Sequence, residues 1–158
     1  MKIIERFDGE YAFLSNFYPS RIPYDIMVGQ YAPTVEHAFQ AIKTQNPEEE
    51  IDILSAATPG QAKRLGRRCQ LRPDWEQVKD DMMRRLITVK FTIPELRQKL
   101  LDTGDAILIE GNNWHDNYWG ICGCDRCRGN GQNKLGQILM QVREEIKNDT
   151  TRITESQN

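Results

Sequence analysis

Three polar residues with complementary chemistry lie close together at positions 36, 40 and 43. Glu36 offers a carboxylate, Gln40 an amide and Lys43 an amine. If residues 35–43 form a helix, the three side chains lie within roughly 60° of one another around its axis. A carboxylate and an amine held together tune each other's pKa, which suits acid–base or amine chemistry. The alternative is a solvated flank of a core helix with a weak i, i+4 interaction.

A second dense segment, residues 112–120, combines aromatic and titratable side chains. It contains Trp114, His115, Asp116 and Trp119, and it follows a predicted buried strand. Aromatic rings can stack on a flat base, and Asp or His can transfer protons. Loops that follow strands often carry functional residues. The alternative is a loop whose tryptophans fill the core and whose Asp and Asn residues form turns.

Three cysteines form a C-x-C-x-x-C pattern at Cys122, Cys124 and Cys127. Zn²⁺ usually takes four protein ligands, so the pattern is one short. The fourth ligand of a zinc site would be Cys69, His115 or Asp125. Because no second C-x-x-C follows, we expect no metal and no cofactor. Zinc binding remains the alternative to reduced cysteines in a loop.

Two further features could hold a phosphate group. Lys63 and Arg67 are one helical turn apart, and a glycine-rich loop at residues 129–133 precedes the last predicted helix. Backbone N–H groups at a helix N-terminus attract anions. The alternative for this loop is a flexible turn with Asn133 as the N-cap.

Hydrophobic periodicity predicts the elements that position these residues. Thr34 is a good N-cap for a helix whose apolar residues 35, 38, 39 and 42 form one stripe. Further helices are expected at about 60–68, from 73 to about 89, at 94–101 and from 133 onward, and strands at 3–7, 26–28 and 106–109. The prediction is a single compact, mostly helical α+β domain with a few short strands over residues 1–147. Residues 148–158 are expected to be a polar, disordered tail.

Composition excludes several classes of protein. The chain has 158 residues, 39% hydrophobic, with a net charge of −2, which suits one globular domain and excludes a strongly basic polyphosphate binder. There is no apolar run of about 18 residues and no signal peptide, so we expect a cytoplasmic protein with no membrane association. Its four cysteines are then reduced or metal-bound. Walker A, G-x-G-x-x-G, H-E-x-x-H and G-x-S-x-G motifs are absent.

Five segments in order resemble the NADAR family, over about residues 7–143. They are residues 13–19, 35–43, 62–67, 75–91, and 119–120 followed by 131–140. The family's S-N-F, E-H-x-F-Q-x-x-K and D-x-Y-W-G patterns correspond to residues 15–17, 36–43 and 116–120. The C-x-C-x-x-C insert departs from the simplest form of the pattern.

This resemblance implies an N-glycosidase that needs no metal and cleaves a C–N bond between a ribose and a base or amine. We expect removal of ADP-ribose from guanine in nucleic acid or nucleotides. The first alternative is clearance of phosphoribosylated intermediates of riboflavin biosynthesis. The second is a non-catalytic module that binds ADP-ribose or nucleotides.

The expected mechanism uses three catalytic residues. Glu36 stabilises positive charge on the ribose or orients water, and Asp116 binds a ribose hydroxyl or acts as the partner acid or base. Lys43 either keeps Glu36 ionised and binds phosphate, or attacks C1′ to form a Schiff base. The predicted substrate-binding residues are Ser15, Asn16, Phe17, Tyr18, Gln40, Lys63, Arg67, Trp75, Trp119, Gly120 and Asn133.

Overall fold

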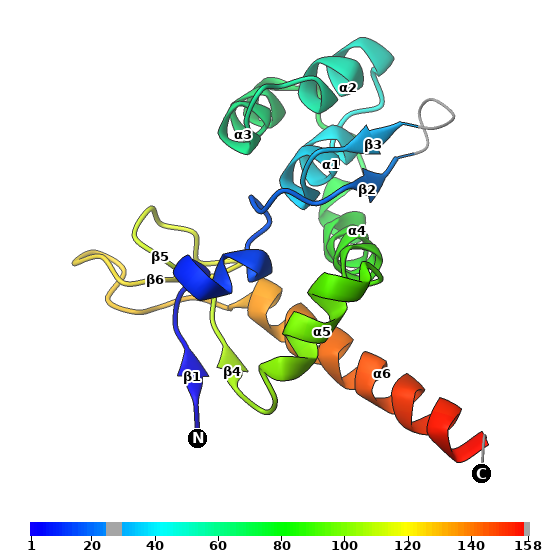
Figure 1. Cartoon of the computed structure of the whole chain (residues 1–158). Helices are drawn as coiled ribbons and strands as arrows, with labels where there is room; N and C mark the ends of the chain where they lie inside the picture. The colour runs from blue at the N-terminus through cyan, green and yellow to red at the C-terminus, as the bar shows by residue number, and fades with distance from the viewer. Residues whose placement is uncertain (25–29, 157–158) are drawn as a thin grey trace. The chain divides into compact units, whose positions relative to one another are not determined.

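The computed structural model describes residues 1–24 and 30–156, and it confirms the predicted α+β, mostly helical class (Figure 1). The strand expected at 26–28 lies outside the described residues. Contacts divide the chain into two units, Asn16–Lys90 on one side and Met1–Ser15 with Phe91–Asn158 on the other. No helix among the described residues is both long enough and apolar enough to cross a membrane.

The unit of residues 16–90 is built around one central helix. This helix, α1 (Val35–Ile42), contacts α2 (Pro47–Leu54), α3 (Pro59–Arg68), α4 (Trp75–Lys90) and strand β3 (Tyr31–Ala32). Strand β3 pairs antiparallel with β2 (Ile22–Pro23). Neighbours on several sides explain why every residue from 35 to 41 is buried.

Local sequence determines where α1 begins. Thr34 has an extended backbone and its hydroxyl accepts a hydrogen bond from the His37 amide, as predicted for an N-cap. The His37 ring is used on both sides, with Nδ1 2.8 Å from Thr34 Oγ1 and Nε2 2.9 Å from the Ala56 carbonyl oxygen. His37 therefore ties the start of α1 to the segment before α3.

Hydrophobic periodicity does not predict helix α2. It has only three large apolar residues, of which Ile53 is buried, so its hydrophobic period is weak. Its N-terminal signals are strong, because the Asn46 side chain caps the Glu48 amide, Pro47 starts the helix and acidic residues fill the first turn. Those signals could have located the helix.

In α4 the helical period predicts one buried stripe, made of Trp75, Val78, Met82, Leu86 and Val89. Trp75 and Leu86 are buried as expected, but the other buried residues are Met83, Ile87 and Lys90, so the buried face differs from that stripe by about one residue. Adjacent apolar pairs such as Met82 and Met83 leave the rotation of a helix undecided until it packs.

The other unit contains a 3₁₀ helix, two parallel strand pairs and two helices. The 3₁₀ helix η1 spans Gly9–Leu14, and the two helices are α5 (Pro94–Asp102) and α6 (Lys134–Ser156). Strand β1 (Ile3–Ile4) pairs with β4 (Ile107–Leu108), and β5 (Gly111–Asn112) pairs with β6 (Ile121–Cys122). Helix α6 packs on α5 and β4 (Figure 1). The core includes an edge-to-face pair of Phe13 and Phe91 with ring centroids 6.5 Å apart.

The polar segment after residue 147 is helical, where composition had predicted a disordered tail. Helix α6 continues without a break to Ser156. Arg97 of α5 donates to the Thr150 hydroxyl at 2.8 Å, and the hydroxyls of Thr150 and Thr151 donate to carbonyls one turn earlier. An already formed helix extends at little cost, so a polar sequence can remain helical there.

Candidate functional site

The polar face of α1 is buried and hydrogen-bonded. Glu36 is 7% exposed and Gln40 is 4% exposed. Gln40 Nε2 donates to Glu36 Oε1 at 2.7 Å, and the Glu36 amide donates to the Asn16 carbonyl at 3.0 Å. The helical spacing brings the carboxylate and the amide together as predicted, and burial makes their hydrogen bond stronger than on a solvated surface.

A glycine of α3 makes room for this pair. A Cβ added at Gly66 would overlap Gln40 Oε1 and lie 2.8 Å from Gln40 Cδ. Only glycine therefore lets α3 approach α1 at this point without displacing the Gln40 amide.

Two side-chain amide oxygens near α1 are buried without a hydrogen-bond partner among the described residues. They are Asn16 Oδ1 and Gln40 Oε1. Asn16 is otherwise anchored, because its Nδ2 donates to Met83 Sδ at 3.5 Å. Most buried polar atoms in proteins have partners, and a catalytic role is one of the explanations for an exception.

Lys43 at the end of α1 has a pKa below the ordinary value for lysine. Burial is the main cause, and the positive charges of Lys63 and Arg67 lower the pKa further, whereas the negative charge of Glu36 and the coupling to the ionised form of Cys69 raise it. Lys63 and Arg67 of α3 and Glu36 of α1 therefore all influence the pKa of the Lys43 amine. A lowered pKa increases the fraction of neutral amine at neutral pH, the form that can act as a nucleophile.

Aromatic rings flank the Lys43 amine. Its Nζ lies 5.9 Å from the ring centroids of Phe39 and Trp75, within cation–π range. The two rings are 5.0 Å apart and tilted by 54°. Trp75 is 6% exposed and belongs to the core, and its contact with the substrate stays a prediction.

Lys90 is a buried cation that the sequence analysis did not select. It has no exposed surface, and its Nζ lies 5.8 Å from the ring centroid of half-buried Tyr18. The neighbouring Phe17 is 42% exposed. Lys90 lies one helical turn after Leu86 and two after Met83 on the buried face, so its position could have been noticed from the helical period.

Asp116, in the other unit, shapes a turn. Its Oδ1 accepts hydrogen bonds from the amides of Tyr118 at 3.2 Å and Trp119 at 2.9 Å. Trp119 is half-buried, whereas Trp114 is 59% exposed. The turn-forming alternative therefore describes the local geometry of Asp116, and its catalytic role stays a prediction.

Three further predicted residues lie against neighbouring backbone: Gly120, Asn133 and Ser15. A Cβ on Gly120 would overlap the Glu110 carbonyl oxygen. Asn133 has a left-handed backbone (φ 51°), accepts from the Glu110 amide and donates to the Leu108 carbonyl, both at 2.9 Å. The Ser15 amide ends η1 by donating to Ala12. Asn133 thus joins β4 to the start of α6.

The same unit contains side chains that could hold a metal. The ligand atoms of His115, Cys122, Cys124 and Cys127 all lie within 4.8 Å of one another. Of the three candidates for a fourth ligand, the structure brings His115 to the thiols.

Comparison with known proteins identifies the family. The NADAR domain matches residues 4–147. The chain belongs to the NADAR domain family. It is 43% identical over 145 residues to the N-glycosidase Npun_R5314 of Nostoc punctiforme, covering 87% of each chain. It is 39% identical over 140 residues to the N-glycosidase YbiA of Escherichia coli K12, covering 87% of this chain and 82% of that protein.

Two further relatives extend this comparison. The chain is 40% identical over 147 residues to the chloroplastic riboflavin biosynthesis protein PYRR of Zea mays, covering 84% of this chain and 23% of that protein. The NMR structure of Escherichia coli YbiA matches with a TM-score of 0.79 and 35% identity, covering 95% of this chain and 88% of that one. The NADAR fold is therefore shared over almost the whole length.

Within this NADAR chain, the predicted residues fall into two groups. In the Asn16–Lys90 unit, most of them lie on or at the end of α1, on α3 or at the start of α4, whereas residues 16–18 precede β2. Glu36, Gln40 and Lys43 of α1 form the electrostatic centre of this group. Asp116, Trp119, Gly120 and Asn133 lie around β5, β6 and the start of α6 in the other unit.

Proposed function

We propose that this protein is an N-glycosidase that hydrolyses the bond between ribose C1′ and the nitrogen of a base or amine in a phosphoribosylated intermediate of the riboflavin-biosynthesis type. The similarity to named N-glycosidases and to riboflavin biosynthesis proteins supports this class of substrate. The observation that carries the proposal is the buried Glu36 carboxylate, which Gln40 holds and which interacts electrostatically with Lys43.

Glu36 acts on the charge that develops during cleavage. As the C–N bond breaks, positive charge builds on the ribose ring, and a fixed carboxylate in a water-poor site stabilises it. The hydrogen bond from Gln40 fixes the carboxylate before substrate binds. Water then adds its oxygen to C1′, and the departing nitrogen takes up a proton.

Lys43 has two alternative roles in this reaction. As a cation it keeps Glu36 ionised and, with Lys63 and Arg67, binds the substrate's phosphate. As a neutral amine it attacks C1′, the base leaves, the sugar ring opens to an imine, and water later releases the sugar. The lowered pKa of Lys43 supports the amine route.

Borohydride reduction of the enzyme with substrate separates these routes. The amine route gives a ribose adduct on Lys43 in the mass spectrum. A fully active enzyme that yields no adduct would assign Lys43 to the electrostatic role.

A second candidate substrate is guanine that carries ADP-ribose. Lys63 and Arg67 stand one turn apart on α3, a spacing that suits the two linked phosphates of ADP-ribose. The residues proposed to contact either substrate are those predicted from the sequence: Ser15, Asn16, Phe17, Tyr18, Gln40, Lys63, Arg67, Trp75, Trp119, Gly120 and Asn133.

The test is a paired turnover assay with a matched control. Wild type, Glu36→Gln and Glu48→Gln are each offered a phosphoribosylaminopyrimidine and guanine-ADP-ribosylated single-stranded DNA. Glu48→Gln is the control, because it makes the same substitution at an exposed position of α2. We expect release of ribose 5-phosphate by wild type and Glu48→Gln, and a loss of about 10²-fold or more in Glu36→Gln.

The other outcomes are equally informative. Release of ADP-ribose instead would assign the second substrate. Binding of either ligand without turnover in wild type would replace the enzyme with a binding module. We also propose a cytoplasmic location, supported by the four cysteines, none of which is in a disulfide.

A further inference from the structure

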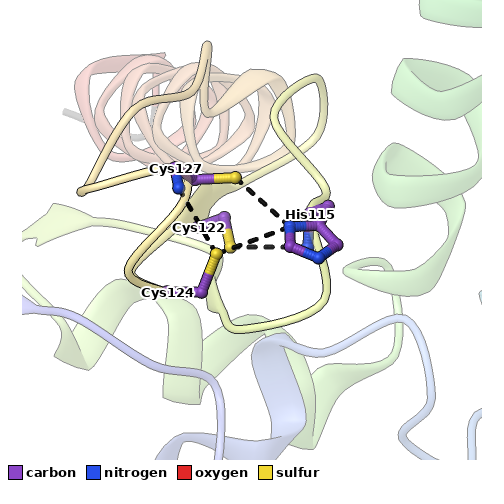
Figure 2. Close-up of side chains that lie close together, drawn as sticks. All are labelled: His115, Cys122, Cys124 and Cys127. Carbon is purple, nitrogen blue, oxygen red and sulfur yellow. Dashed lines mark hydrogen bonds between the residues drawn. The ribbon is translucent and has the colours of Figure 1, made fainter.

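We infer that His115, Cys122, Cys124 and Cys127 form a structural zinc site in this NADAR protein. Figure 2 shows the four side chains pointing toward one another. His115 follows β5, Cys122 belongs to β6, and Cys124 and Cys127 lie in the loop after it. His115 and the three cysteines come together through the tertiary fold, because the pairing of β5 with β6 brings the segment after β5 to the cysteine pattern.

The distances fit tetrahedral coordination. His115 Nδ1 lies 3.3 Å from Cys127 Sγ and 3.4 Å from Cys124 Sγ. With Zn–S of about 2.3 Å and Zn–N of about 2.0 Å, a tetrahedral site separates sulfur from nitrogen by about 3.5 Å. The whole set of ligand atoms lies within 4.8 Å, so small adjustments bring all four to one ion.

The surrounding donors suit thiolates. The His115 amide donates to Cys122 Sγ and the Cys127 amide to Cys124 Sγ, each at 3.4 Å. Asn117 Nδ2 donates to Cys127 Sγ at 3.5 Å. N–H donors aimed at sulfur stabilise the negative charge that metal-bound thiolates carry, and they orient the ligands.

The backbone around the cluster needs a constraint. His115 and Arg128 both adopt left-handed conformations, at φ 69° and 55°. Such conformations cost free energy in residues other than glycine and persist where the surroundings hold them. A metal bond to the His115 ring would supply that hold.

Three sulfurs and one nitrogen in a tetrahedron favour Zn²⁺. Four protein ligands leave no open position, so the ion is structural and takes no part in hydrolysis. Its effect is to clamp the loop that continues directly into Asp116 and the turn to Trp119. The site would therefore fix the D-x-Y-W-G segment of this chain.

Metal analysis tests the inference without any turnover assay. Full-length protein is purified from zinc-supplemented cells without chelator, and zinc is counted by mass spectrometry. We expect about one zinc ion per chain in wild type. The matched control is Cys69→Ser, because Cys69 lies outside the cluster and its thiol donates to the Gly66 carbonyl at 3.2 Å.

Cys69→Ser should retain the zinc, and the double variant Cys124→Ser/Cys127→Ser should lose it. His115→Asn removes the imidazole but keeps a residue that tolerates the left-handed backbone, so it should bind zinc at least 10-fold more weakly. Zinc well below stoichiometric in wild type after reconstitution, or equal zinc in wild type and the double variant, would overturn the inference.

Cobalt and thiol reactivity cover the case in which a variant fails to fold. Wild-type protein reconstituted with Co²⁺ should show the strong visible absorption of tetrahedral coordination and thiolate charge-transfer bands. At most the Cys69 thiol should react with a thiol reagent in the native holoprotein, and Cys122, Cys124 and Cys127 should become reactive after chelation. Weak octahedral cobalt spectra, or four reactive thiols in zinc-loaded wild type, would overturn it. Because none of these readouts needs substrate, they stand or fall separately from the glycosidase proposal.

Discussion

Replacing Gly66 with alanine should both destabilise the protein and disorganise Glu36. The added Cβ would overlap Gln40 Oε1, and it would lie 2.8 Å from Cδ and 3.1 Å from Cβ of the same side chain. To relieve the overlap, Gln40 must turn away, and Gln40 is the donor to the buried Glu36 carboxylate at 2.7 Å. One methyl group on α3 thus reaches the proposed catalytic residue through a single neighbour.

The expected change in the free energy of unfolding is the sum of two destabilising contributions and one stabilising contribution. Overpacking costs about 1–3 kcal/mol, and loss of a hydrogen bond to a buried charge costs about 1.5–3 kcal/mol. Alanine is favoured over glycine within a helix by about 1 kcal/mol. The expected net loss in the free energy of unfolding is about 1.5–5 kcal/mol. Turnover should also fall, because Glu36 loses its orientation.

Gly60→Ala is the matched control in the same helix. A Cβ added at Gly60 would have Thr58 Oγ1 as its nearest neighbour, at 3.9 Å, which is an ordinary van der Waals contact. Gly60→Ala should therefore be neutral or stabilising by up to about 1 kcal/mol. Urea denaturation measures both variants. Combining Gly66→Ala with Gln40→Ala should cost less than the sum of the single changes, because the smaller side chain removes most of the overlap. Equal stability of Gly66→Ala and Gly60→Ala would refute the reasoning.

Three other predictions follow from the hydrogen bonds. Tyr24 donates to Glu50 at 2.8 Å, and burial followed by this bond raises the Tyr24 pKa. Its stabilisation is therefore full below the unfolded pKa of about 10 and is lost as pH rises above it. Tyr24→Phe should cost about 1–2 kcal/mol at pH 7 in urea titrations and progressively less above pH 10, whereas a pH-independent difference would contradict this. Asp116→Asn keeps an oxygen acceptor for the turn but removes the charge, so unchanged thermal stability with at least about 10²-fold lower turnover is expected. Full activity would leave Asp116 a turn former only. Asn133→Ala removes two hydrogen bonds in a buried position and should cost about 2–4 kcal/mol, and a loss below about 0.5 kcal/mol in calorimetry would argue against its structural role.

Local sequence was sufficient where one helix and its cap decide the structure. The apolar stripe of α1 and the Thr34 cap predicted its position, and the helical period put Glu36, Gln40 and Lys43 on one face. Hydrophobic periodicity did not predict α2, because the apolar period of that helix is weak. Polar composition predicted disorder after residue 147, where α6 continues as a helix. In both places capping or propagation outweighed hydrophobicity.

What the sequence determined by itself is the chemistry available: a carboxylate, an amide and an amine at helical spacing, two cations one turn apart, and three thiols in a short pattern. Only the tertiary structure decided how these groups behave. Packing of α3 at Gly66 buries Glu36 with Gln40, and burial lowers the pKa of Lys43. The pairing of β5 with β6 brings His115 to the thiols. Spacing along a chain defines which groups share an element, whereas desolvation and convergence depend on contacts between elements, which no local pattern encodes.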